Sequence, residues 1–356
     1  MFDDSDPVEQ VPFPDKPALN SSPVLSVPVK MIYEEAASLK RSRFFLLLLL
    51  CLLPVLCLAE YAPLPFDSSP GLPGIPDAFL PDYAGYEDET LSIRIETTRA
   101  YDTTIQLVYV KISDPSQMRT AMADRYGTTR IAYPEVLAER NNAVLAVNGD
   151  FFNMHNRGYL VRQGETYRTR ADTHLDILII DDKGDFHILR DPTNEMVAAF
   201  EGKIINSFNF GPALIMDGEE ILPPKRVDAG TFRKAQRMVA CQLGPLSYLF
   251  VATEGPENKG SKGLTLEEMI HFLHELKVPL AYNLDGGSST SVVLGGTKIN
   301  GTSNKKKRTL CDILYFSTLI PESEWADAKP VWKDHLPELG KKENSGESER
   351  AEIPLK

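Results

Sequence analysis

The feature that most constrains the fold is a series of short apolar runs that end abruptly at glycine, proline, asparagine or aspartate. Ala143–Phe152 reads AVLAVNGDFF, and the run Pro279–Leu284 stops at an Asp-Gly-Gly sequence. Apolar runs of roughly four to eight residues between turn residues are typical of buried β-strands, because a helix needs about ten residues with a 3.6-residue period. We therefore expect an α+β fold, a single domain with a mainly antiparallel mixed sheet and a few packing helices.

Turn residues also predict which strands pair, and helical signals are fewer. A Gln-Gly pair in Leu160–Arg168 and a Lys-Gly pair in Asp176–Leu189 each predict a hairpin. A serine at the start of residues 116–126 predicts a short capped helix there. Thr265 and Glu268 form a capping box in front of an apolar helical face, which predicts a second helix.

The N-terminal part of the chain lacks the pattern of a folded core. Residues 1–30 contain six prolines, so we expect them to be disordered or to precede the true start at Met31. Residues 31–59 join a basic start to the apolar run Phe44–Ala59, which is short for a membrane span and predicts a secretory signal peptide. A lipoprotein modified at Cys57 and a retained membrane anchor are the alternatives.

Composition predicts the other boundaries. Residues 60–88 contain six prolines and are expected to form an extended linker. Residues 89–320 carry the strand and helix patterns and are expected to form the domain. Residues 321–356 are charged and poor in apolar side chains, so we expect a loosely ordered tail.

Cysteines and charge limit the possible partners. Removal of the signal peptide would leave Cys241 and Cys311 in an oxidising compartment, either as one disulfide or as two buried thiols, since sequence does not show whether they lie within bridging distance. The formal net charge of −12 disfavours nucleic acid as a partner. Any anionic ligand would have to be held by a local basic site.

Polar residues stand at the beginnings or ends of several apolar strands. Rigid strand ends can hold polar head groups toward a cleft. An ordinary Asp-Gly turn is the alternative for Asp285, because asparagine, glycine and aspartate are common turn residues. We expect six polar residues to converge on one pocket, namely Asp150, Arg237, Glu254, Asn283, Asp285 and Arg308.

With these pieces in place, the chain resembles the phosphodiester glycosidase family from about Ala143 to Phe316. One departure is Glu254, where the family usually has an aspartate. The resemblance rests on motifs in the family's order: VNGDFF at Val147–Phe152, GPALIMDGE at Gly211–Glu219, RMVACQLGP at Arg237–Pro245, GLTLEEM at Gly263–Met269, NLDGGSST at Asn283–Thr290 and the strand after Arg308.

This resemblance implies a hydrolase that cleaves the glycosidic bond of a sugar-1-phosphodiester, with a surface or extracellular glycan as substrate, since bacterial relatives often belong to surface-polysaccharide pathways. Phosphate leaves as an anion, so the site needs cations and hydrogen-bond donors for the phosphate and a carboxylate that activates water. The catalytic candidates are Asp285, Glu254 and Asp150. The substrate-binding candidates are Asn148, Arg237, Asn283, Gly286, Gly287, Ser288, Ser289 and Arg308.

Two other functions fit the same residues. One is a noncatalytic carbohydrate-binding domain of envelope or exopolysaccharide assembly, since a fold does not guarantee an activity. The other is a metal-dependent phosphoesterase that cuts the P–O bond. No cofactor is required for the glycosidase, although a divalent cation such as calcium could be held by the oxygens of Asp150, Glu254 and Asp285.

We predict export with cleavage after Ala59, because Cys57 and Ala59 place small residues at the −3 and −1 positions. Mass spectrometry of the secreted protein should find an N-terminus near Glu60. Recovery from the cytoplasm alone would contradict this prediction.

Overall fold

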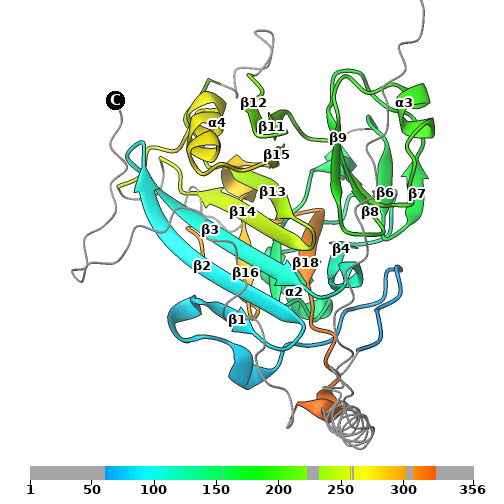
Figure 1. Ribbon diagram of the computed structural model, residues 1–356, viewed down its shortest axis with the longest axis vertical. Helices are drawn as coiled ribbons and strands as arrows, with labels where there is room; N and C mark the ends of the chain where they lie inside the picture. The colour runs from blue at the N-terminus through cyan, green and yellow to red at the C-terminus, as the bar shows by residue number, and fades with distance from the viewer. Residues whose placement is uncertain are drawn as a thin grey trace, which may run out of the picture. The chain divides into compact units, whose positions relative to one another are not determined.

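The structure is a computed structural model that describes residues 61–325, except positions 155, 223–231, 257, 259 and 302–307 (Figure 1). The predicted disordered start, the predicted signal peptide and most of the predicted tail lie outside the described residues. Within them, no helix is long and apolar enough to cross a membrane.

The sheet with the most strands forms one side of the main core. Its eight strands are, in spatial order, β1 (Gly85–Glu87), β2 (Leu91–Ala100), β3 (Thr103–Ile112), β14 (Ser247–Thr253), β13 (Met238–Gly244), β15 (Leu280–Leu284), β11 (Ala213–Met216) and β12 (Glu219–Glu220).

The remaining strands of the described residues form three smaller sheets. The five-stranded sheet has the order β17 (Thr297–Lys298), β16 (Val292–Leu294), β5 (Leu145–Asn148), β18 (Asp312–Phe316) and β4 (Met118–Met122). The three-stranded sheet has the order β10 (Ile204–Phe208), β8 (Ile177–Asp181) and β9 (Phe186–Leu189), and the hairpin consists of β6 (Leu160–Arg162) and β7 (Glu165–Arg168). Every strand pairing in the described residues is antiparallel. The expected α+β fold with mainly antiparallel sheets is confirmed.

The helices are short. In the part of the chain that the structure describes, the α-helices are α2 (Pro134–Arg140), α3 (Asn194–Ala198) and α4 (Leu266–Glu275). The predicted capping box is present at α4, where Thr265 and Glu268 each accept a hydrogen bond from the other's backbone N–H. The 3-10 turns cover Pro76–Ala78, Pro81–Tyr83, Pro115–Gln117, Phe152–Met154, Gly287–Ser289 and Glu322–Glu324.

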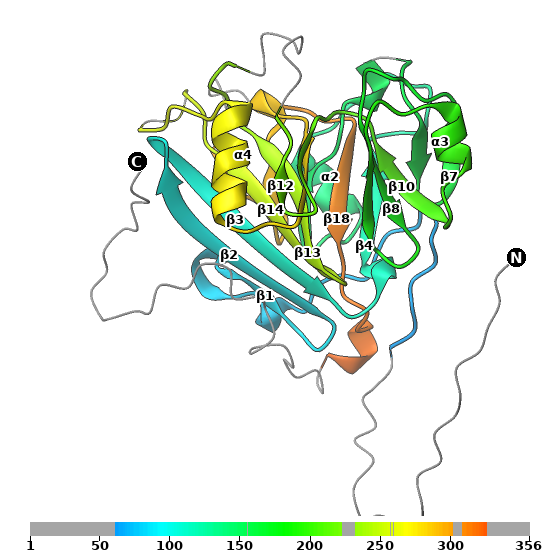
Figure 2. The same ribbon diagram turned by 45° about the horizontal axis from the view of Figure 1, so that its top comes forward.

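The main core lies between the eight-stranded and five-stranded sheets. In β5, Leu145 and Val147 belong to this core, whereas Ala146 belongs to a cluster on the other face that includes α2. In β13, Val239 and Cys241 pack instead with α4, which covers the outer face of the large sheet (Figure 2). Both faces of these strands are buried, and this explains why their sequences are continuous apolar runs and not alternating patterns.

The helix predicted over residues 116–126 does not form. Residues 115–117 make a 3-10 turn, and Met118–Met122 is the edge strand β4, paired with β18. Ser116 is not the capping residue, because the side chain of Asp114 accepts from the Ser116 backbone N–H. Pairing with a buried strand outweighs a weak helical preference.

The predicted linker is part of the folded unit. Strand β1 joins the large sheet, and the preceding segment is anchored by Arg119, whose side chain is fully buried in β4. The Arg119 guanidinium donates to the carbonyl oxygens of Pro65 at 2.8 Å, Asp67 at 3.0 Å and Ser69 at 2.9 Å. Proline removes backbone donors but leaves carbonyl acceptors. A proline-rich segment can therefore be held by a buried arginine without forming a strand.

Candidate functional site

The segment from Asp285 to Ser291 carries the chain from one sheet to another. It follows β15 of the eight-stranded sheet and precedes β16 of the five-stranded sheet. Asn148, at the end of β5, holds both ends of this crossover: its Nδ2 donates to the Asp285 carbonyl at 2.7 Å, and its Oδ1 accepts from the Ser291 backbone N–H at 3.0 Å. The two strand ends that carry the Asn-Gly-Asp and Asp-Gly-Gly sequences therefore meet.

A cavity of about 110 Å³ lies at this meeting point. Asp285 is partly exposed, Asp150 is almost completely buried, and Arg308 is exposed. Five of the predicted site residues line the cavity, namely Asn148, Asp150, Asp285, Ser289 and Arg308. Its other lining residues are Ile131, Gly149, Phe151, Asn153, Met154, Thr309, Leu310, Cys311 and Asp312.

Asp285 is the partly exposed carboxyl of this cavity, and its pKa is raised. Removal from water raises the pKa of Asp285 to about 6, while hydrogen bonds from Ser289 and the Gly286 backbone and the positive charge of Arg308 oppose the increase. The negative charge of Asp150 raises this pKa further. A carboxyl with a pKa near 6 is ionised at neutral pH and can still take up a proton readily, as a general base must.

Asp150 belongs to a buried charge cluster that the sequence did not reveal. Its Oδ1 accepts from Arg162 at 2.9 Å and from the Phe152 backbone N–H at 3.1 Å, and its Oδ2 accepts from the Asn209 backbone N–H at 2.8 Å. The same guanidinium donates to Asp312 Oδ2 through Nε at 3.0 Å and Nη2 at 2.7 Å. One buried arginine therefore serves two buried carboxylates.

The cluster also explains the glycine between Asn148 and Asp150. A Cβ atom on Gly149 would lie 2.5 Å from Asp312 Oδ1, which is closer than nonbonded atoms approach. Burial raises the pKa of Asp312, with Arg162 opposing and Asp150 adding to the increase. The guanidinium carbon of Arg162 lies 4.4 Å from the centroid of the Phe208 ring, so an aromatic face also contacts the cation.

Arg237 and Glu254 do not line the cavity. The side chain of Arg237 is 8% exposed, and its guanidinium donates to the carbonyl oxygens of Leu264 at 3.0 Å and Arg233 at 2.8 Å. Desolvation, together with Arg233, lowers its pKa to about 10. In this geometry Arg237 anchors the chain ahead of α4.

Glu254 instead supports a second polar network. Its Oε1 accepts from the Gly301 backbone N–H at 2.7 Å. Beside it, Lys298 Nζ lies within 2.9–3.3 Å of four oxygens, those of the Thr290, Asn300 and Gly301 carbonyls and the Asn300 side chain. This network ties the end of the crossover to residues 300–301.

Four other predicted residues also lie outside the cavity lining. Asn283 is buried and donates to the Gly211 carbonyl at 2.7 Å. A Cβ on Gly286 would meet the Gln236 carbonyl oxygen at 2.8 Å, and the Gly287 N–H donates to that oxygen, also at 2.8 Å. The absence of a side chain at Gly286 thus lets the crossover lie against the backbone just before β13, and the Gly287 amide is not available to cradle an anion. Ser288 lies in the 3-10 turn Gly287–Ser289.

The cysteines and possible metal ligands can be placed as well. Cys241 and Cys311 are both free and buried, and they belong to different apolar clusters. Burial raises the pKa of the Cys311 thiol, which donates to the Asp150 carbonyl at 3.1 Å. Within the described residues, no group of three or more His, Cys, Asp or Glu side chains is arranged to hold a metal ion. Glu254 binds the Gly301 amide and lies outside the cavity of Asp150 and Asp285.

Comparison with known proteins identifies the family that the sequence matches. A model of the phosphodiester glycosidase family matches residues 141–317, a range that contains every cavity-lining residue except Ile131. The resemblance to this family is confirmed. No curated protein matches the sequence.

Solved structures show a related fold. The catalytic domain of zebrafish N-acetylglucosamine-1-phosphodiester alpha-N-acetylglucosaminidase, auto-inhibited by its pro-peptide, is 17% identical with a TM-score of 0.52. The alignment covers 64% of this chain and 83% of that chain. A hypothetical protein from Synechocystis is 16% identical, with a TM-score of 0.45 over 64% of this chain and 62% of that one. At this identity, the likeness to the zebrafish domain shows a shared fold.

The charge cluster predicts a large effect of Arg162→Met. This change leaves Asp150 and Asp312 buried without their shared cation, so the free energy of unfolding should fall by about 3–5 kcal/mol. Urea denaturation at neutral pH measures it. Arg170→Met is the matched control, since Arg170 is exposed and lies shortly after the β6–β7 hairpin that contains Arg162. Equal losses in the two variants would contradict the role assigned to Arg162.

Proposed function

We propose that the protein hydrolyses the glycosidic bond of a sugar-1-phosphodiester and releases a free sugar and a phosphomonoester. The observation that carries the proposal is the placement of a carboxyl with a raised pKa, Asp285, in one small polar cavity with an exposed arginine, Arg308. The family match supports the reaction class. The expected export signal favours a surface or extracellular glycan as the substrate.

Asp285 is the general base in this proposal. Its carboxylate accepts a proton from water, the water oxygen bonds to the anomeric carbon, and the bond between that carbon and the phosphate oxygen breaks. The electron pair of the broken bond leaves with the phosphate. Since a phosphomonoester has a second pKa of about 6, this leaving group needs no general acid.

Arg308 binds the phosphate in this proposal. It lines the cavity, and a guanidinium fork matches two phosphate oxygens. A volume of about 110 Å³ admits the reacting groups but not a whole glycan, since pockets for complete small ligands hold roughly 300–1,000 Å³. The sugar chain or aglycone must therefore extend beyond it.

Asp150 acts through its charge. Its two oxygens already accept three hydrogen bonds, from Arg162 and from the backbone at Phe152 and Asn209. These donors fix the position of the carboxylate. Its negative charge helps to keep the pKa of Asp285 high, and this makes Asp150 a positioning and electrostatic residue.

The pH profile tests the role of Asp285. A base must be deprotonated, so kcat/KM on a benzyl diester of N-acetylglucosamine-1-phosphate or glucose-1-phosphate should rise with pH through about 6. Asp285→Asn should lose at least about a hundredfold in kcat, in line with the usual contribution of a general base. At pH 7 this variant should be at least as stable as the parent, because the raised pKa means that the ionised form is disfavoured by folding.

Product analysis separates the alternatives. In heavy-oxygen water, the label should enter the sugar, because the C–O bond is cut. Label in the phosphate would instead show a phosphoesterase, and binding of the diester without any product would show a noncatalytic domain. Near-normal turnover by Asp285→Asn would also end the proposal.

Arg308→Ala tests phosphate binding. Loss of a charge-assisted hydrogen bond costs about 1.5–3 kcal/mol, which corresponds to roughly a 10- to 150-fold higher KM. Arg308→Lys should recover part of the loss. Arg130→Ala is the control, since Arg130 is an exposed arginine of the neighbouring loop that does not line the cavity. Equal effects of the two alanine changes would contradict the assignment.

A further inference from the structure

We infer that a second, larger cavity binds a chain of neutral or amino pyranose sugars. It has a volume of about 940 Å³ and lies between the N-terminal segment around Phe66, strand β4, the loop after it and the β6–β7 hairpin. The choice of a carbohydrate as the occupant rests on the proposed function. The location and charge preference rest on the geometry described next.

The two cavities share a wall. Ile131 lines the small cavity, and Asp124, Arg125 and Tyr126 of the same loop line the large one. Arg162 lines the large cavity and also binds Asp150 of the small one. A substrate too long for the small cavity therefore has a second cavity bordered by the same loop.

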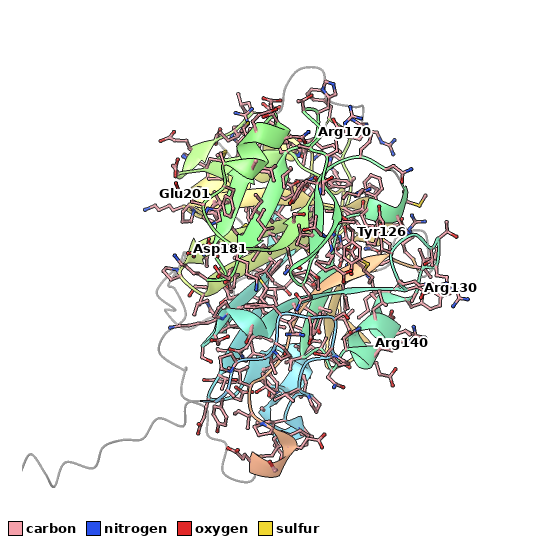
Figure 3. All side chains as sticks on the ribbon, turned by 90° about the vertical axis from the view of Figure 1, so that its right-hand side faces the viewer. Tyr126, Arg130, Arg140, Arg170, Asp181 and Glu201 are labelled. Carbon is pink, nitrogen blue, oxygen red and sulfur yellow. The ribbon has the colours of Figure 1, made fainter. Side chains whose placement is uncertain are left out.

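Aromatic rings form a row in this wall. Tyr126 is 37% exposed, and its ring centroid lies 5.1 Å from that of Tyr167 and 6.3 Å from that of Phe152. In Figure 3, Tyr126 and Arg130 lie on the same side, well separated from Asp181 and Glu201. An exposed ring held by two other rings is a rigid flat surface. Such a surface suits the apolar face of a pyranose, because burying it costs little conformational freedom.

The floor of the cavity is preformed and polar. Gln163 and Thr120 are buried there, and Gln163 accepts from the Thr120 backbone N–H at 3.2 Å and donates to the Asp67 carbonyl at 3.2 Å. Glu165 accepts from the Tyr167 hydroxyl at 2.8 Å. The carboxylate of Glu165 keeps lone pairs that can accept hydrogen bonds from sugar hydroxyls.

Charge decides which glycans fit. Three carboxylates line the cavity, those of Asp67, Asp124 and Glu165. Its arginines are Arg125 and Arg162, and the charge of Arg162 is already matched by Asp150 and Asp312. Asp67 and Asp124 in turn lie 3.5 Å from Arg119 and 3.4 Å from Arg130, which leaves Glu165 and Arg125 to balance each other. The lining therefore offers no excess of positive charge to a polyanionic glycan, and a neutral or amino sugar does not need one.

Calorimetric binding to the Asp285→Asn protein tests the inference, because Asp285 does not line the large cavity and its substitution leaves that cavity's lining unchanged. The probes are chitohexaose and cellohexaose as neutral chains, a glucosamine hexamer as a cationic chain and hexagalacturonate as an anionic chain. At least one neutral or cationic chain should bind, and hexagalacturonate should bind more weakly than that chain. Failure of all of the neutral and cationic chains to bind, or a preference for hexagalacturonate, would overturn the inference.

Variants locate the binding. Tyr126→Ala should weaken it about threefold to tenfold, and Tyr126→Leu, which keeps apolar bulk but no flat ring, should recover little. Tyr83→Ala is the control, because Tyr83 is 52% exposed and lies outside this cavity. Equal weakening by Tyr83→Ala and Tyr126→Ala would overturn the location. Failure of the parent protein to hydrolyse phosphodiesters would end the proposed function and leave this direct binding result standing.

Discussion

The candidate site depends on the buried guanidinium of Arg162. It joins Asp150, after β5, to Asp312, at the start of β18, and it also donates to the Ser207 carbonyl of β10. Burying three charged groups is unfavourable unless each keeps its partners. These contacts therefore fix the position of the five-stranded sheet relative to the three-stranded sheet. They also fix the position of Asp150 beside Asp285.

Much of the fold could be predicted because local signals agreed with the tertiary structure. Both hairpins, the capped helix α4 and the strands that contain Leu145 and Leu284 lie where their patterns placed them. The helix predicted at Ser116 failed because β4 gains a partner in β18, which is distant in sequence. Docking of the proline-rich segment was missed for a similar reason, since its anchor, Arg119, lies far along the chain.

The candidate site could be predicted in part. Asp150, Asp285 and Asn148 were found because they end apolar strands. Arg162 and Asp312 were missed because each is one charge beside an apolar strand, and only the fold brings them together. The alternation of side chains along a strand explains why Arg237 lies outside the cavity, contrary to the prediction. It has the same parity as Val239, which packs with α4, and its guanidinium accordingly binds the Leu264 carbonyl just ahead of that helix.

The crossover at Asp285–Ser291 couples the chemistry to the packing of the two sheets. Asp285 follows the last residue of β15 in the eight-stranded sheet. Asn148 ends β5 of the five-stranded sheet, and Asp150 and Arg308 flank strands of that same sheet. Any sliding of one sheet across the core would change the separation between the base and the groups that tune it. The large apolar core between the sheets thus acts as a spacer for the site. Substitutions deep in that core, far from any substrate, would then alter alignment of the reacting groups before they unfold the protein.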